Sequence, residues 1–508
     1  MESNNFKTSD IAFAFAMLAC GFLYCNLIRL ISLGAGVAIF AVVLFAVSLI
    51  YMTKSGIKQN KGSIICLVLA GLSATQFVLF DNQYVKLLGF MFVTVLFIYW
   101  VCLSTGRRID KMLSLYITGD AVNQGIVVPF MNFGRCGAGI KAGFSNQKKG
   151  KGALAAVLGV LIFLPAIAVV FKLLMSADLA FESFAEKLYE MVRIDEVLTY
   201  AGQIVLGIPV AFYLYGLIYG DVKGRHTGAV TISSVDRAAE AVRIAPKIAI
   251  YSALATFCLV YIVFFAVQAV YLFSALGGHL PEAFTYAEYA RRGFFELCAV
   301  SGINLAVLAV CHIAVEREKG EEPKALRIET AAVSLLTILL IATALCKMAL
   351  YIDAYGLTQL RVFTSWFMVL LLFVFLTICI RQFKKFNSAR LMIAGFALMF
   401  IILSYGNVDG LIAKSNIQRY EAGTLKTIDI DALHALSDAA VPYIYDFYTK
   451  ADGSDDALRQ ELAHAIMDKN DFGGTGFRSF NMQKQRAEEI RKNMRGQLLA
   501  ESRLCYND

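Results

Sequence analysis

The stretch EYARRGFFELCAVSGINLAVLAVCHIAV, residues 288–315, decides the fold class of this chain. After its two arginines it stays apolar over the ~20 residues that an α-helix needs to cross the ~30 Å hydrocarbon core of a bilayer. Glu296 lies only a few residues inside this apolar run. The stretch therefore predicts a membrane-spanning helix that carries a carboxylate near one end.

Similar apolar runs recur along the chain. Of its 508 residues, 58% are hydrophobic and 17% are charged, whereas soluble proteins carry about 25% charged residues. Runs of this length suit helices rather than the alternating strands of a membrane barrel. The sequence predicts an all-α, polytopic integral membrane helix bundle with about 11 spans, near residues 11–27, 30–52, 63–80, 84–104, 153–176, 199–220, 248–277, 293–315, 329–352, 361–381 and 389–405.

The net charge of +8 follows from an uneven distribution of basic residues. Most Lys and Arg residues of the short loops lie on one side of the predicted bundle, which indicates a cytoplasmic N-terminus and an external C-terminus. The same rule explains these charges without a nucleic-acid partner. The predicted domains are four N-terminal spans (1–104), a cytoplasmic basic or interfacial linker (105–152), a seven-span membrane core (153–405) and a small helical extracytoplasmic domain (406–508).

Helical patterns also occur outside the spans. Residues 121–134, AVNQGIVVPFMNFG, are apolar but contain Gly125 and Pro129. They predict either an interfacial, partly re-entrant element or an amphipathic connector. In the tail, TIDIDALHALSDAAVPYIYDFYTK (427–450) predicts one helix, and SDDALRQELAHAIMDK and RAEEIRKNMRGQLLAESRL predict two more.

Ionisable residues gather at the outer ends of neighbouring predicted spans. Glu296 lies about one turn deep, with Arg292 four residues before it, and Asn304 lies roughly 12 Å deeper at 1.5 Å per residue. Lys347 is expected at the same depth as Glu296, near the external end of its own span. The candidate polar cluster consists of Arg292, Glu296, Asn304, Lys347, Asp353 and Arg361.

Two interpretations of this cluster remain open. Its charges either lock three spans together through buried ion pairs, or line an outward-facing cavity that holds a small molecule, a lipid headgroup or the tail. If the tail folds back over this layer, Asn416, Arg419 and Tyr420 should reach it first. No nucleophile, metal-binding spacing or cofactor motif accompanies the cluster, so the sequence predicts no catalytic residue, metal or cofactor and leaves enzymatic activity undecided.

Four blocks of the sequence resemble a bacterial membrane family. EYARRGFFELCAVSGINL, DAYGLTQLRVFTSWFM, LSDAAVPYI and GFRSFNMQKQRA are similar to blocks of the domain-of-unknown-function families 4153 and 4173. The resemblance covers roughly the fifth to eleventh spans and the tail, and Phe480 stands where that pattern would have tryptophan. It implies a multi-pass protein of the bacterial plasma membrane and supplies no reaction, ligand or catalytic residue.

Three classes of function follow from these observations. The first is binding or transport of a small polar molecule or a lipid headgroup at the outer polar cluster. The second is an envelope sensor or scaffold, whose external domain binds a protein partner while the basic loops contact membrane lipids. The third is an enzyme acting on a lipid-linked substrate, which the very short first external loop argues against.

Overall fold

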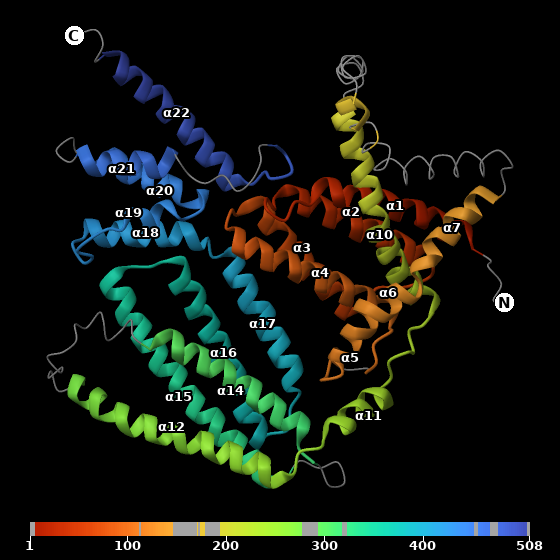
Figure 1. The fold of residues 1–508 in the computed structure, drawn as a ribbon, viewed down its shortest axis with the longest axis horizontal. Coiled ribbons are helices and arrows are strands. Elements are labelled where there is room, and N and C mark those ends of the chain that lie inside the picture. The colour runs from red at the N-terminus through yellow and green to blue at the C-terminus, as the bar shows by residue number, and fades with distance from the viewer. Residues whose placement is uncertain are drawn as a thin grey trace.

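The protein is a helical membrane protein whose chain folds into two helix bundles and a tail domain (Figure 1). The structure is a computed structural model, and it describes residues 6–110, 113–145, 170, 173–177, 194–276, 293–316, 323–451, 456–467 and 476–504. Within these ranges no β-strand occurs; one isolated bridge joins Ala245 and Val315. The all-α class predicted from the sequence is confirmed.

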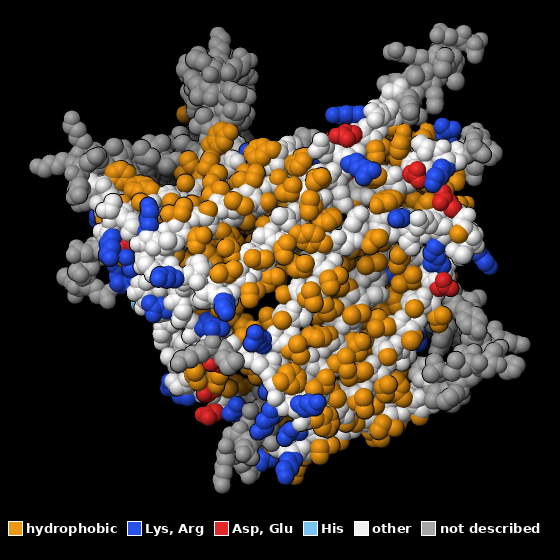
Figure 2. Space-filling model, turned by 180° about the vertical axis from the view of Figure 1, so that it is seen from behind, with side chains coloured by type: hydrophobic (Ala, Val, Ile, Leu, Met, Phe, Trp, Pro, Cys, Tyr) orange, Lys and Arg blue, Asp and Glu red, His pale blue; other side chains and the backbone are white. Residues whose placement is uncertain are grey.

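Ten described helices contain segments long and apolar enough to cross a membrane. Figure 2 shows a broad hydrophobic surface with Lys and Arg gathered along its margins, as expected of helices that face lipid. The predicted run at 153–176 falls mostly outside the described residues, so the structure leaves the count of about 11 a prediction. The ten helices are α1 (Thr8–Leu27), α2 (Ala35–Lys54), α3 (Lys61–Leu79), α4 (Gln83–Thr105), α10 (Ile194–Lys223), α12 (Lys247–Leu276), α14 (Phe294–Ala314), α15 (Lys324–Tyr355), α16 (Gln359–Phe383) and α17 (Ser388–Tyr405).

The first bundle is built from α1 to α4 and α10 around a common apolar core. Helices α1 and α10 cross closely, because a β-carbon on Gly21 would lie 2.2 Å from the Gly207 carbonyl oxygen. Small residues at such crossings let membrane helices gain contact where the hydrophobic effect gives no driving force. The buried Trp100 of α4 and Tyr215 of α10 fill the centre of this bundle.

The segment after α4 is helical and covers one side of the first bundle. It comprises α5 (Ile117–Val122), a π-helix η1 (Asn123–Val127), α6 (Val128–Met131) and α7 (Phe133–Ser145). Pro129 cannot donate a backbone hydrogen bond to the carbonyl of Gly125, and the Tyr213 hydroxyl donates to that carbonyl instead, at 2.9 Å. The kinked segment is thus held against α10 rather than left as a loop.

The second bundle contains α12, α14, α15 and α16, and α11 (Ile232–Val242) precedes it. Helix α17 packs on α16, where the Trp366 indole donates to the Met399 carbonyl at 3.1 Å. It also packs on α4, where the rings of Phe92 and Phe400 lie 4.9 Å apart. Helix α17 therefore joins the two bundles (Figure 1).

The tail domain follows α17 directly, and its apolar core also includes Val85 of α4 and Leu403 of α17. The prediction of one continuous helix over 427–450 is wrong, because Pro442 starts a new helix at α20 and a short turn precedes it. The helix α18 was not predicted, although the two later tail helices were. The tail elements are α18 (Val408–Glu421), α19 (Ile430–His434), the 3-10 helix η2 (Asp438–Ala440), α20 (Val441–Lys450), α21 (Asp456–Met467) and α22 (Met482–Leu504).

Candidate functional site

The predicted pair of Glu296 and Lys347 lies at the start of α14. Glu296 is exposed in the first turn of α14, whereas Lys347 of α15 is buried. The Lys347 ammonium would lie 3.6 Å from a β-carbon added to Gly293, the residue that caps α14. The two residues interact electrostatically, so the structure brings them near one another. Arg292 lies outside the described residues.

Asn304 has a different environment. Its side chain is fully buried, accepts a hydrogen bond from the Tyr261 hydroxyl at 2.5 Å and donates one to the Thr337 hydroxyl at 2.9 Å. These contacts join α12, α14 and α15 in the middle of the second bundle. Asn304 therefore acts as an interhelical polar bridge, as buried amides do in membrane helices.

Asp353 and Arg361 lie at the turn between α15 and α16. The Arg361 guanidinium donates to the carbonyls of Tyr355 (3.0 Å) and Gly356 (2.5 Å) at the end of α15, and it lies 4.1 Å from the centre of the Tyr351 ring. This is the position where a cation satisfies terminal carbonyls and the helix dipole. The Asp353 side chain is 85% exposed. The predicted cluster is therefore divided among three environments.

The tail domain reaches this turn as predicted. Asn416 of α18 accepts from the Leu357 amide at 2.7 Å and donates to the Leu357 carbonyl at 2.8 Å. Arg419 pairs with the Asp353 carboxylate at 3.1 Å and donates to the Ile352 carbonyl at 2.9 Å. Tyr420 instead packs against Phe447 within the tail domain. The prediction is confirmed for Asn416 and Arg419, and their contacts are those of a docking surface.

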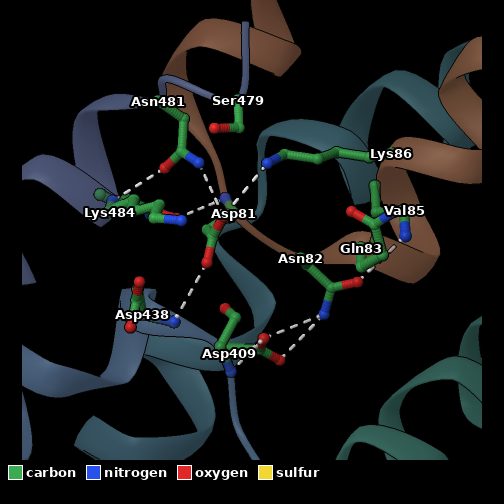
Figure 3. Close-up of polar contacts among 12 residues, drawn as sticks. Asp81, Asn82, Gln83, Val85, Lys86, Asp409, Asp438, Ser479, Asn481 and Lys484 are labelled. Atoms are coloured by element: carbon green, nitrogen blue, oxygen red, sulfur yellow. Dashed lines mark hydrogen bonds and ion pairs between the residues drawn. The ribbon is translucent and has the colours of Figure 1, made fainter. Parts of the chain in front are cut away.

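A larger polar network lies where the tail domain meets the turn between α3 and α4, and we call it the Asp81 junction (Figure 3). The Asp81 carboxylate pairs with the ammonium of Lys86 at 3.1 Å and accepts from the side-chain amide of Asn481 at 2.7 Å. It also accepts from the backbone amide of Asp438 at 3.3 Å. One carboxylate thus holds together the α3–α4 turn, η2 and the start of α22.

Asp409 forms the second centre of the Asp81 junction. This carboxylate is 1% exposed and accepts from the Asn82 side chain, with both oxygens 3.0 Å from the amide nitrogen. It also accepts from Gln359 at 2.8 Å and from the Ser437 backbone amide at 3.1 Å. Asn82 itself caps α4 through the Val85 amide at 3.0 Å. Asp409 therefore binds the first bundle, α16 and the tail domain together.

The GFRSFN block supplies further contacts of the junction. The Ala35 amide donates to the Phe480 carbonyl and the Gly36 amide donates to the Arg478 carbonyl, both at 2.9 Å. A β-carbon on Gly34 would lie 2.5 Å from the Ser479 carbonyl carbon, so only glycine permits this approach. Residues 476–481 consequently dock on the turn between α1 and α2.

A cavity of about 340 Å³ opens beside the Asp81 junction. Its walls mix charged and neutral polar side chains with apolar ones, in the way that small-molecule sites do. Three carboxylates and three cationic groups contribute, so their formal charges balance. The lining includes Ser32, Asp81, Gln83, Tyr84, Lys86, Asp409, Asp438, Lys484 and Arg491.

Little in the sequence indicates this site. Its charged residues come from the α3–α4 turn and the start of α4, and from α18, η2 and α22, which follow more than 300 residues later in the chain. The one local signal is Asp81 five residues before Lys86, at the start of an apolar run. Among the described residues no group of three His, Cys, Asp or Glu side chains could hold a metal ion.

Comparison with known proteins identifies a family without a known activity. The model of the family described as "Domain of unknown function (DUF4153)" matches residues 64–447. No curated protein and no solved structure matches the chain. The matched residues include Asp81, Lys86, Asp409 and Asp438 of the junction, and end before the 476–481 segment.

Proposed function

We propose that the cavity at the Asp81 junction binds a small polar molecule or a lipid headgroup. The chain belongs to the DUF4153 family and crosses the membrane many times. The cavity is the observation that carries this proposal, because it joins polar walls of balanced charge to a volume of about 340 Å³. Ligand pockets commonly begin near 300 Å³.

The basic loops support an outward orientation for this cavity. Lys54, Lys58 and Lys61 flank the turn between α2 and α3, at the opposite end of α3 from Asp81. Basic loops stay in the cytoplasm, so the junction and the tail domain face outward in our proposal. We place the protein in the bacterial plasma membrane, where such a cavity would meet headgroups of the outer leaflet or solutes of the envelope.

The balanced charges favour a neutral or zwitterionic ligand. Asp81 already pairs with Lys86, and Arg491 pairs with Asp438. An ion with a single net charge would have to compete with these buried pairs, which is costly. Hydroxyl, amide or zwitterionic groups can instead use the remaining hydrogen-bonding capacity of the walls.

A scaffold or sensor role is the second candidate, and a specific observation favours it. The tail domain is fastened to the membrane bundles at two places, by Asp81 with Asn481 and by Asp353 with Arg419. Such fastening would present the outer surface of the tail domain to a protein partner at a fixed orientation. In that case the cavity would hold water only.

Identification of copurified molecules tests the proposal. The full chain is purified in mild detergent and its bound lipids and small molecules are identified by mass spectrometry. Ser32→Trp would fill the cavity, since Ser32 lines it without joining the Asp81 network. Ser55→Trp, at the exposed turn after α2, is the matched control.

The proposal expects one molecular species that the wild type and Ser55→Trp retain and Ser32→Trp loses. Equal recovery of every bound species from all three proteins would contradict binding in this cavity. A folded wild type with no bound species under any purification condition would favour the scaffold role.

A further inference from the structure

A second buried polar cluster lies at the other end of α4. It differs from the Asp81 junction because several of its side-chain atoms have no hydrogen-bond partner in the described part of the chain. Helix α4 begins beside Asn82 and ends at Thr105, a distance of roughly 35 Å at 1.5 Å per residue. We call this group the Asp221 cluster. It contains Thr105, Asn123, Gln124, Asn132 and Asp221, and all but Thr105 are 1% exposed or less.

Asp221 is a fully buried carboxylate with an incomplete set of contacts. Its Oδ2 atom accepts from the Thr105 hydroxyl at 3.3 Å. Its Oδ1 atom has no hydrogen-bond partner among the described residues. Arg107 lies nearby, yet its Nε donates to the Asp221 backbone carbonyl at 3.1 Å rather than to the carboxylate. One buried carboxylate oxygen is thus left for another ligand.

Gln124 supplies an independent indication of a ligand. Its side chain is 1% exposed and lies beside the Asp221 carboxylate. The Gln124 amide is close enough to the Asp221 carboxylate to interact with it, yet neither its oxygen nor its nitrogen makes a hydrogen bond of normal geometry within the described part of the chain. The side-chain oxygens of Asn123 and Asn132 are buried and unpartnered in the same way. Such groups are rare in native structures unless an ion, a proton or water completes them.

The nearby carboxylate of Asp10 shows what a completed site looks like. Asp10 is 1% exposed and pairs with the Lys223 ammonium at 2.8 Å, while the Tyr51 hydroxyl donates to it at 2.9 Å. Asp10 contacts helix α10 through Lys223 and Asp221 belongs to that helix, and both carboxylates are buried. An ionised carboxylate buried without a cation is costly, and Asp221 has no counterpart of Lys223 within the described residues.

The backbone around Gln124 is also unusual. Gln124 belongs to η1, the π-helical stretch between α5 and α6. Single π-helical turns inside α-helices occur frequently at functional sites, because they reposition side chains that a regular helix would direct elsewhere. The hydrogen bond from Tyr213 to Gly125 stabilises this turn from α10, the helix that also carries Asp221.

We infer that Asp221, together with Gln124 and Thr105, binds a monovalent cation, either sodium or a proton. Carboxylate, amide and hydroxyl oxygens are the ligands that hard cations prefer. One carboxylate balances a single positive charge, whereas a divalent ion would leave an excess of positive charge in a buried site. Within the described ranges, the other charged or titratable side chains that interact with Asp221 are Cys102, Arg107 and Asp120.

This inference does not depend on the cavity at the Asp81 junction. The two sites lie at opposite ends of α4, share no residue and can be tested in separate variants. A variant that loses the ligand of the outer cavity should keep its response to cations, and a variant that loses the cation response should keep the outer ligand.

Thermal unfolding of the full chain in detergent tests the inference. Sodium chloride is compared with choline chloride at equal ionic strength, at an acidic and an alkaline pH. The variants are Asp221→Asn and, as the matched control, Asp10→Asn, whose carboxylate already has a cation. If sodium binds, wild type and Asp10→Asn unfold at a higher temperature in sodium chloride than in choline chloride, and the difference is largest at alkaline pH. Asp221→Asn should unfold at the same temperature in both salts.

If a proton is the bound cation, sodium and choline act alike. The unfolding temperature of wild type and Asp10→Asn then falls as pH rises through the titration of Asp221, and Asp221→Asn lacks that fall. Identical responses of wild type and Asp221→Asn to both sodium and pH would overturn the inference. If Asp221→Asn fails to fold, Gln124→Leu replaces it, because this variant keeps the carboxylate. Gln124→Leu should weaken the sodium response. An unchanged sodium or pH response in Gln124→Leu would also overturn the inference.

Discussion

The two ends of α4 present the same kinds of side chain in opposite states. At the Asp81 junction, Asp81 accepts from Lys86, Asn481 and one backbone amide. Asp409 accepts from Asn82, Gln359 and a second backbone amide. At the Asp221 cluster, a carboxylate oxygen and several amide atoms have no partner in the described part of the chain. The first arrangement is a completed joint beside an open cavity, whereas the second is an incomplete shell.

The difference teaches how buried carboxylates divide between architecture and binding. A carboxylate that is fully satisfied by protein groups stabilises one arrangement of the elements around it. Burying a carboxylate whose oxygens lack hydrogen-bond partners costs free energy, and a bound cation can remove that cost. Variants at the two ends should therefore respond differently, in stability at the junction and in ligand dependence at the Asp221 cluster.

The largest expected effect is at the centre of the junction. Asp81→Asn leaves the Lys86 ammonium, whose side chain is 4% exposed, without its counter-ion. Breaking a buried pair in this way should lower the free energy of unfolding by about 3–5 kcal/mol. The double variant Asp81→Asn with Lys86→Met removes both charges and should recover much of the loss.

Denaturant unfolding in detergent measures both variants, with Asp446→Asn as the control. Asp446 pairs with Lys450 on the surface, so its loss should leave the free energy of unfolding nearly unchanged. A double variant as unstable as Asp81→Asn would show that the other contacts of Asp81, rather than its charge pair, hold the joint.

The next effect concerns the docked 476–481 segment. Gly34→Ala places a β-carbon against the Ser479 backbone, and overpacking of this kind typically costs about 1–3 kcal/mol. The same substitution at Gly71, which has open space around it, should be neutral or slightly stabilising because alanine favours helix. Limited proteolysis of the tail domain compares the two variants; equal protease resistance would mean that the close approach at Gly34 is dispensable.

A smaller effect is expected at the pair predicted from the sequence. Glu296 is exposed, so Glu296→Gln and Lys347→Met should each change the free energy of unfolding by about 1 kcal/mol or less. Both variants and their combination can be measured as a double-mutant cycle. Strong destabilisation by each single variant with recovery in the double would make this pair a structural lock of the Asp81 kind, and would remove it from the candidate ligand contacts.

The smallest effect is expected at the second fastening of the tail. Asp353 is mostly exposed, so Asp353→Asn should cost less than about 1 kcal/mol. Arg419→Met should cost more, since it also removes hydrogen bonds to the carbonyls of Ile352 and Asp353. Their unfolding midpoints rank the two contributions; a larger loss from Asp353→Asn would mean that the ion pair outweighs the carbonyl contacts.

The sequence predicted the membrane helices well because their signal is local. Each span is a continuous apolar run, and the observed helices differ from the predicted runs by a few residues at their ends. Glu296 and Lys347 were identifiable for the same reason, since charges stand out inside apolar runs. The helix over 427–450 was mispredicted because its buried positions Leu433, Leu436, Ala440 and Ile444 continue in register across a turn.

The candidate site escaped sequence analysis because its residues meet only in three dimensions. Asp81, Asp409, Asp438 and Asn481 each occur in polar stretches where a charged or amide side chain is ordinary. Asp221 and Gln124 lie at the edge of a span and in an apolar connector, respectively, and neither position shows that its side chain lacks partners. Tertiary contacts alone distinguish the completed site from the incomplete one.

Cysteine accessibility in intact cells tests the central claim, that the Asp81 junction opens to the outside. Tyr84 lines the cavity and is 66% exposed, and Lys58 is exposed at the other end of α3. With the native cysteines as background, a membrane-impermeant maleimide should label Tyr84→Cys in intact cells and label Lys58→Cys only after permeabilisation. Labelling of Lys58→Cys in intact cells, with Tyr84→Cys protected until the membrane is opened, would contradict the account.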